Sequence, residues 1–135
     1  MNKNLYNDDE YVDLGLRDAQ KLMTEILKEV HKICEKHNIK YFLDAGTLIG
    51  AVRHKGFIPW DDDLDIGMLR EDYRKFLEIA KKELPDNLFL QTFDSDENYD
   101  IYQVPCKIRY NNTLFIQKVI AENPDMHNGI YIDVL

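Results

Sequence analysis

Residues 57–67 read Phe57-Ile58-Pro59-Trp60-Asp61-Asp62-Asp63-Leu64-Asp65-Ile66-Gly67. Four carboxylates lie within five residues, and an apolar pattern resumes directly after them. In an extended strand, Asp61, Asp63 and Asp65 share one face, whereas Leu64 and Ile66 point to the other. The alternation predicts a strand over residues 62–68 that is buried on one side and carboxylate-lined on the other.

A carboxylate row of this kind needs a counter-charge. Side chains two residues apart on a strand are separated by roughly 6–7 Å, and two negative charges ~5 Å apart repel by about 3 kcal/mol at an effective dielectric of about 20. A divalent cation with oxygen ligands removes this repulsion. The alternative is a solvated acidic loop, which has no reason to alternate with Leu64 and Ile66. We therefore predict that Asp63 and Asp65 bind a metal ion, that Asp61 contributes in phase, and that Asp62 is structural.

Composition narrows the class of protein. The 135 residues suffice for one domain with a core, and 44% are hydrophobic. A net charge of −8 argues against general nucleic-acid binding. No apolar run approaches the ~20 residues that cross a membrane, and the N-terminus lacks a signal core. Cys34 and Cys106, far apart in apolar contexts, are predicted to be buried and reduced. We expect a cytoplasmic protein.

Hydrophobic periodicity predicts a mixed α/β domain, an α+β arrangement in which helices pack against a mixed sheet. The polar residues 1–12 are predicted to form a loose arm, and residues 13–135 a single domain. Helices are expected over 13–36, 47–53 and 70–84, and strands over 40–44, 62–68, 88–93, 103–110, 114–117 and 129–135. Asp13 is a candidate cap and Asn38 a candidate stop for the first helix. Because the sequence stops inside or directly after the apolar strand expected over 129–135, we expect it to be truncated at its C-terminus.

Two further features bear on chemistry. Gly46-Thr47 lies at a strand-to-helix turn, where a helix N-terminus can seat a phosphate; the alternative is a plain turn capped by Thr47. Asp133 is a single acid inside an apolar strand, which is unusual unless the acid is paired or metal-bound; the alternative is an exposed position at the sheet edge.

Basic residues accompany these acids. Arg53, His54 and Lys55 follow the second helix, and Lys107 and Arg109 alternate along one strand. Either set can hold phosphate oxygens or serve as ion-pair partners of the acids. Trp60 is expected to pack under the acidic strand, with stacking on a base or choline as the alternative.

The arrangement resembles the nucleotidyltransferase fold of the DNA polymerase β type, and more closely the LicD family of phosphocholine transferases, related to fukutin and fukutin-related protein. The resemblance is carried by residues 46–67, by Arg70-Glu71-Asp72-Tyr73, and by the later blocks at residues 107–109 and 129–133.

The resemblance implies transfer of a phospho-alcohol such as phosphocholine from a CDP-activated donor to a hydroxyl of a surface glycan, for example lipopolysaccharide or teichoic acid, with release of CMP. Asp63 and Asp65 would then hold Mg²⁺ or Mn²⁺. Asp133 would be a further ligand or the base that takes the acceptor proton.

Two alternatives remain open at this point. One is a small nucleotidyltransferase that adds NMP from an NTP to a small molecule or macromolecule. The other is an inactive metal-binding fragment.

Overall fold

The computed structural model of the protein describes residues 11–99, 104–116 and 123–135. The predicted arm lies outside these ranges except for residues 11–12, as do residue 103 of one predicted strand and residue 117 of another. In the described parts, three helices pack with one mixed sheet, which confirms the predicted fold class.

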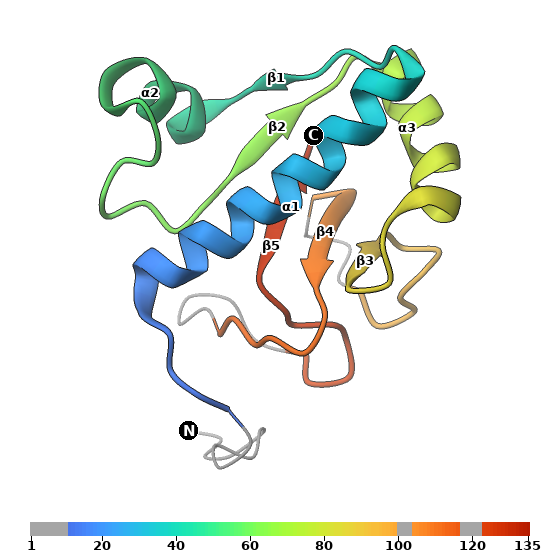
Figure 1. The fold of residues 1–135 in the computed structure, drawn as a ribbon. Coiled ribbons are helices and arrows are strands. Elements are labelled where there is room, and N and C mark those ends of the chain that lie inside the picture. Colours follow the sequence, from blue (N-terminus) through green and yellow to red (C-terminus); the bar gives the residue numbers. More distant parts are fainter. Residues whose placement is uncertain (1–10, 100–103, 117–122) are drawn as a thin grey trace.

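The five strands are ordered β1-β2-β5-β4-β3 across the sheet. They are β1 (Phe42–Leu43), β2 (Asp65–Gly67), β3 (Leu88–Gln91), β4 (Cys106–Tyr110) and β5 (Tyr131–Val134). The β2–β5 pair is parallel, and the other three pairs are antiparallel. As a result β5 lies in the middle of the sheet, between β2 and β4 (Figure 1).

The three helices are α1 (Gly15–His37), α2 (Ala45–His54) and α3 (Arg70–Glu83). Helix α1 crosses the sheet and contacts α3, β4 and β5 (Figure 1). It buries Met23, Ile26, Val30 and Ile33 at the three- and four-residue steps expected of an amphipathic helix. It ends where Asn38 adopts a left-handed conformation with φ 55°, as the predicted stop requires.

Helix α2 lies beside β2, near the edge of the sheet that β1 forms (Figure 1). Its N-cap is Asp44, whose side chain accepts a hydrogen bond from the Ala45 N–H at 2.8 Å. Thr47, the cap in the alternative interpretation of this turn, is instead in the first turn of the helix. The helix expected over 47–53 begins two residues earlier, at Ala45.

The two faces of the sheet differ in chemistry. Buried apolar side chains form the core face toward α1: Ile66, Leu90, Cys106, Ile108, Ile132 and Val134. Because side chains alternate along a strand, the residues between them face the other way. These intervening residues include Asp65, Gln91, Lys107 and Asp133, so the second face carries the polar groups.

Two predicted strands differ from the structure. The strand expected over 62–68 is present only as β2, over Asp65–Gly67, because the Asp61 side chain accepts a hydrogen bond from the Asp63 N–H and turns the chain just before it. The predicted turn at Asn111-Asn112 is present, with φ 61° at Asn112, but residues 114–116 do not form a strand. Both edges of β4 are already paired, with β3 and β5, so no edge is left for a hairpin partner.

The remaining expectations are close to the structure. The first helix begins at Gly15 and its N-cap is Leu14 rather than Asp13; the Asp13 side chain still accepts a hydrogen bond from the Gly15 N–H at 3.1 Å. Cys34 and Cys106 are both buried and free, as predicted.

Candidate active site at the β2–β5 junction

Four polar residues form a row across four neighbouring strands. The register aligns Gln91 of β3 with Lys107 of β4, Lys107 with Asp133 of β5, and Asp133 with Asp65 of β2. Residues that are partners in register point to the same face of a sheet. The row brings together three predicted site residues that are up to 68 positions apart in sequence, and it places Asp133 inside the sheet rather than at the exposed edge that was the alternative.

The carboxyl groups of Asp65 and Asp133 lie within hydrogen-bonding reach of each other. Burial, the negative charge of Asp133 and the hydrogen bond to Asp133 raise the pKa of Asp65 to about 7. The charges of Asp63 and Asp61 add to this effect. Without a cation, burial and the neighbouring carboxylates therefore favour the protonated form of Asp65 up to near neutral pH.

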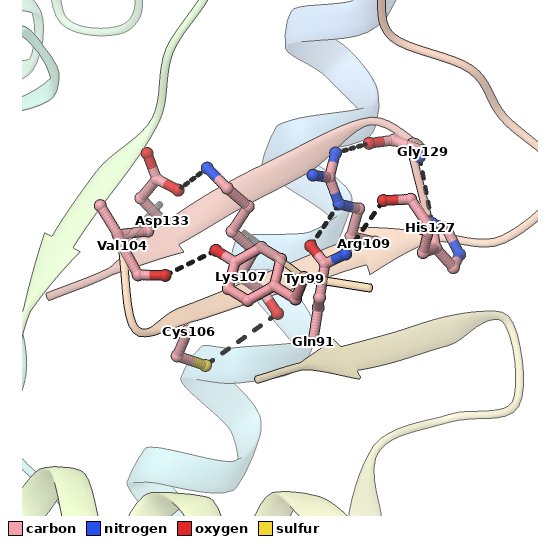
Figure 2. Close-up of polar contacts among 9 residues, drawn as sticks. All are labelled: Gln91, Tyr99, Val104, Cys106, Lys107, Arg109, His127, Gly129 and Asp133. Carbon is pink, nitrogen blue, oxygen red and sulfur yellow. Dashed lines mark hydrogen bonds and ion pairs between the residues drawn. The ribbon is translucent and has the colours of Figure 1, made fainter. Parts of the chain in front are cut away.

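Lys107 provides one internal counter-charge. Its Nζ lies 2.6 Å from Oδ1 of Asp133, and both side chains are largely buried (Figure 2). The same Nζ lies 3.8 Å from the ring centroid of Tyr131. Burial lowers the pKa of Lys107 and the charge of Asp133 opposes that change. Of the two roles left open by the sequence, these contacts favour the ion-pair partner; binding of phosphate by Lys107 stays a prediction.

The acidic run adds a second group of carboxylates. One carboxylate oxygen from each of Asp61, Asp62 and Asp63 lies within 4.8 Å of the others. Burial, followed by the charges of Asp62, Asp61 and Asp133, raises the pKa of Asp63. The pKa of Asp63 is therefore affected both by the acids of the run, Asp61 and Asp62, and by Asp133 of β5.

The arrangement of this group differs from the predicted row on a strand. Asp61 and Asp63 precede β2, and Oδ1 of Asp61 accepts a hydrogen bond from the Asp63 N–H at 3.2 Å, which turns the chain. The turn brings in Asp62, which strand alternation had assigned to a structural role only. The alternation was right for Leu64 and Ile66, which are both buried.

The Gly46-Thr47 turn meets this acidic run. A Cβ atom at Gly46 would lie 2.7 Å from Oδ2 of Asp61, so the Asp61 carboxylate sits directly against the glycine. The Thr47 hydroxyl accepts a hydrogen bond from the Asp65 N–H at 2.9 Å, and the Asp44 N–H donates to the Asp65 carbonyl at 3.0 Å. The amino end of α2 is thereby fixed beside Asp61 and Asp65, with the N–H groups of its first turn near the carboxylates.

The basic residues predicted to bind phosphate lie elsewhere on α2. Arg53 and His54 form the carboxyl end of the helix, about 15 Å of helix length from its start, and Lys55 is the C-cap. All three are exposed. Their phosphate role stays a prediction. Trp60, expected to pack under the acidic strand, is 74% exposed and meets only the edge of the His54 ring, at 6.5 Å between ring centroids, so the packing interpretation was wrong.

Arg109 is the centre of a separate buried network (Figure 2). Its Nε donates to Oε1 of Gln91 at 2.7 Å, and one terminal nitrogen donates to the Gly129 carbonyl at 2.6 Å. The Gln91 amide in turn donates to Asp96 and to the His127 carbonyl, each at 3.0 Å. These contacts join β3 and β4 to the segment that leads into β5, and hence support the strand that carries Asp133. A phosphate role for Arg109 stays a prediction that its contacts do not favour.

Fold and site together define a class of protein: an α+β domain that gathers carboxylates from a turn and two parallel strands beside a helix N-terminus. The family model for the nucleotidyltransferase domain of LicD, FKTN and FKRP matches residues 38–133. The chain belongs to this LicD family.

Relatives in the family include named transferases. A lipopolysaccharide cholinephosphotransferase, LicD of Haemophilus influenzae, is 46% identical over 79 residues, which are 58% of this chain and 30% of the relative. The human ribitol 5-phosphate transferase FKRP is 40% identical over 50 residues, 37% of this chain and 10% of the relative. The mouse ribitol-5-phosphate transferase FKTN is 30% identical over 77 residues, 55% of this chain and 17% of the relative. The matched region thus spans less than a third of each relative.

The structure also bears on membrane insertion. Within the described ranges, no helix is both long enough and apolar enough to span a bilayer. A cytoplasmic location stays a prediction.

Proposed function

We propose that the chain provides the donor-binding and metal-binding part of a transferase that moves a phospho-alcohol from a CDP-linked donor to a hydroxyl of a glycan. The observation that carries the proposal is the pairing of Asp65 with Asp133, next to Asp63 and to the amino end of α2. Membership in a family that includes a cholinephosphotransferase and ribitol 5-phosphate transferases supports the transferred group.

The donor set fits a hard divalent cation. Asp65, Asp133 and Asp63 offer carboxylate oxygens, the ligands that Mg²⁺ and Mn²⁺ prefer. Burial, and then the charges of the neighbouring carboxylates, raise the pKa of Asp63 and Asp65, and a bound cation would offset both effects. When bound, Mg²⁺ or Mn²⁺ would neutralise the charge of the diphosphate.

The chain's own groups would orient the donor. The N–H groups at the amino end of α2 would face the phosphate oxygens, and Gly46 lets the Asp61 carboxylate lie against this end of the helix. The acceptor hydroxyl oxygen would form a bond to the phosphorus that bears the alcohol, the bond from that phosphorus to the oxygen of the leaving CMP would break, and the hydroxyl proton would pass to solvent.

Asp133 fits the role of ligand better than that of base. Its Oδ1 atom already accepts a hydrogen bond from Lys107 Nζ at 2.6 Å, and the strand register fixes the carboxyl group beside Asp65, where both can face one cation. We therefore place Asp133 with Asp63 and Asp65 in the ligand set, and Asp61 and Asp62 beside it.

Calorimetric titration of this chain tests the proposal. In the presence of Mn²⁺ we expect CDP-choline or CDP-ribitol to bind, and Asp133→Asn to abolish the binding. The exposed residue Asp94 supplies a control, Asp94→Asn, that should bind as the wild type does. Metal-dependent binding of ATP or CTP in preference to both CDP-linked donors would instead favour the nucleotidyltransferase alternative. Absence of binding by any nucleotide would favour the inactive fragment.

A further inference from the structure

Gln20 is a polar residue on the buried face of α1. Its side chain is only 2% exposed and lies next to the apolar stripe that includes Ala19 and Met23. A buried amide is costly unless its hydrogen-bonding groups have partners. The side-chain amide of Gln20 should therefore have hydrogen-bond partners inside the protein.

The partners of Gln20 belong to the segment that precedes and begins the acidic run. Its amide nitrogen donates to the Asp61 carbonyl at 2.8 Å, and it lies 3.4 Å from the Pro59 carbonyl and 3.5 Å from that of Ile58. Its amide oxygen accepts a hydrogen bond from Arg17 at 3.3 Å. The bond to Asp61 is the strong one, since the other two are at the limit of hydrogen-bonding distance.

The same segment is held from its other side by α2. A Cβ atom at Gly50 would lie 2.4 Å from the Gly56 carbonyl oxygen and 3.0 Å from the Ile58 nitrogen, so the two backbones touch. The Asp61 N–H also donates to the Ile58 carbonyl at 2.9 Å, which closes a turn. Residues 56–61 are therefore fixed between α1 and α2.

The Asp61 carbonyl lies close in the chain to the carboxylates of the acidic run. It belongs to the peptide group that joins Asp61 to Asp62, and the Asp61 side chain accepts the Asp63 N–H. Fixing this peptide group sets the direction in which the carboxylates of Asp61, Asp62 and Asp63 project.

We propose that Gln20 is a positioning residue, which orients the carboxylates of residues 61–63 for a divalent cation through its bond to the Asp61 carbonyl. The inference rests on the proposed function, because that function places Asp63 in the ligand set, with Asp61 and Asp62 beside it. Outer partners that orient metal ligands typically change metal affinity by about 10- to 100-fold when they are removed.

The test uses the whole chain and Mn²⁺ alone, with free Mn²⁺ followed by electron paramagnetic resonance. Gln20→Met keeps the size of the side chain and removes the donor, and Gln20→Glu places an oxygen against the carbonyls. We expect each to weaken Mn²⁺ binding about 10-fold or more. Ile26→Val, a core substitution in the same helix, is the control and should bind Mn²⁺ as the wild type does. Wild-type affinity in Gln20→Met would overturn the inference.

Amide hydrogen exchange without metal supplies a second readout that separates the inference from the proposed function. In Gln20→Met we expect faster exchange at the Asp61 and Asp63 N–H groups, with exchange in β4 unchanged. If the wild type does not bind Mn²⁺, the metal assignment fails, and unchanged exchange at Asp61 and Asp63 would overturn the positioning role of Gln20 as well.

Discussion

Replacing Asp65 by asparagine should stabilise the metal-free protein at pH 8, although it removes a proposed ligand. In the wild type, Asp65 is ionised at this pH beside the carboxyl groups of Asp133 and Asp63. An asparagine amide carries no charge and can still hydrogen-bond to Asp133. The substitution therefore removes repulsion while conserving the shape of the side chain.

The magnitude follows from the pKa of Asp65. A rise from 3.8 to about 7 corresponds to about 4 kcal/mol, at about 1.36 kcal/mol per pH unit. Asp65 is only partly buried, and solvent screening reduces the expected gain to about 1–2 kcal/mol. For a domain of this size we expect a rise in Tm of about 3–8 °C.

The stability difference between Asp65→Asn and the wild type should depend on pH. Because the pKa of Asp65 is raised in the folded state, its contribution to stability is complete below about pH 4 and is lost as the pH rises through about 7. The advantage of Asp65→Asn over the wild type should accordingly be largest at pH 8 and vanish near pH 4.

Thermal unfolding followed by circular dichroism in chelator-treated buffer, from pH 4 to pH 8, measures this difference. Asp94→Asn serves as the control and should follow the wild type at every pH. An Asp65→Asn variant that melts at or below the wild-type temperature at pH 8 would refute the argument that the carboxylates repel one another. When Mn²⁺ is added, the wild type should gain stability and Asp65→Asn should not.

The remaining predictions concern the supports of the site. Lys107→Met should destabilise the chain by about 3 kcal/mol or more in urea unfolding, because it leaves Asp133 without its buried partner. Adding Asp133→Asn should recover part of the lost stability. A double variant as unstable as Lys107→Met would contradict the prediction. Gly50→Ala should destabilise the chain by about 2 kcal/mol or more, because the added Cβ would lie 2.4 Å from a backbone oxygen. The Cβ added by Gly46→Ala would contact only the Asp61 side chain, so this variant should mainly weaken Mn²⁺ binding. Equal losses of stability in the two variants would refute the distinction. In NMR titration His127 should show a pKa below 6.5, because burial and then Arg109 disfavour its charged form. The stability due to neutral His127, whose Nδ1 accepts the Gly129 N–H, is lost as the pH falls below about 6.5, so a pKa at or above 6.5 would contradict its placement.

Periodicity sufficed for those parts of the fold that depend on a single element. The stripe of Met23, Ile26 and Val30 predicts α1, and Asn38 predicts its end, because burial and a left-handed residue are local properties. The acid in β5 was singled out for the same reason, since a carboxylate between two buried residues is visible in sequence.

The predictions that failed concern residues whose structure depends on contacts with other segments, which the sequence alone does not show. The strand over 62–68 was shortened by the turn in which the Asp61 side chain accepts the Asp63 N–H, and residues 114–116 had no free edge of β4 with which to pair. Gln20 and Gln91 were missed because a buried glutamine differs from a surface one only in its partners. The one available signal was that Gln20 falls three residues before Met23, in phase with the buried stripe.

The central place of β5 has a consequence for how the site comes into being. Without β5, the sheet consists of two separate antiparallel ladders, β1 with β2 and β3 with β4, and Asp65 and Lys107 have no common partner. Insertion of β5 joins the ladders and introduces Asp133 between these two side chains in the same event. Assembly of the carboxylate pair is thus inseparable from completion of the sheet, and a cation that binds both aspartates would stabilise the joined sheet as well as the site.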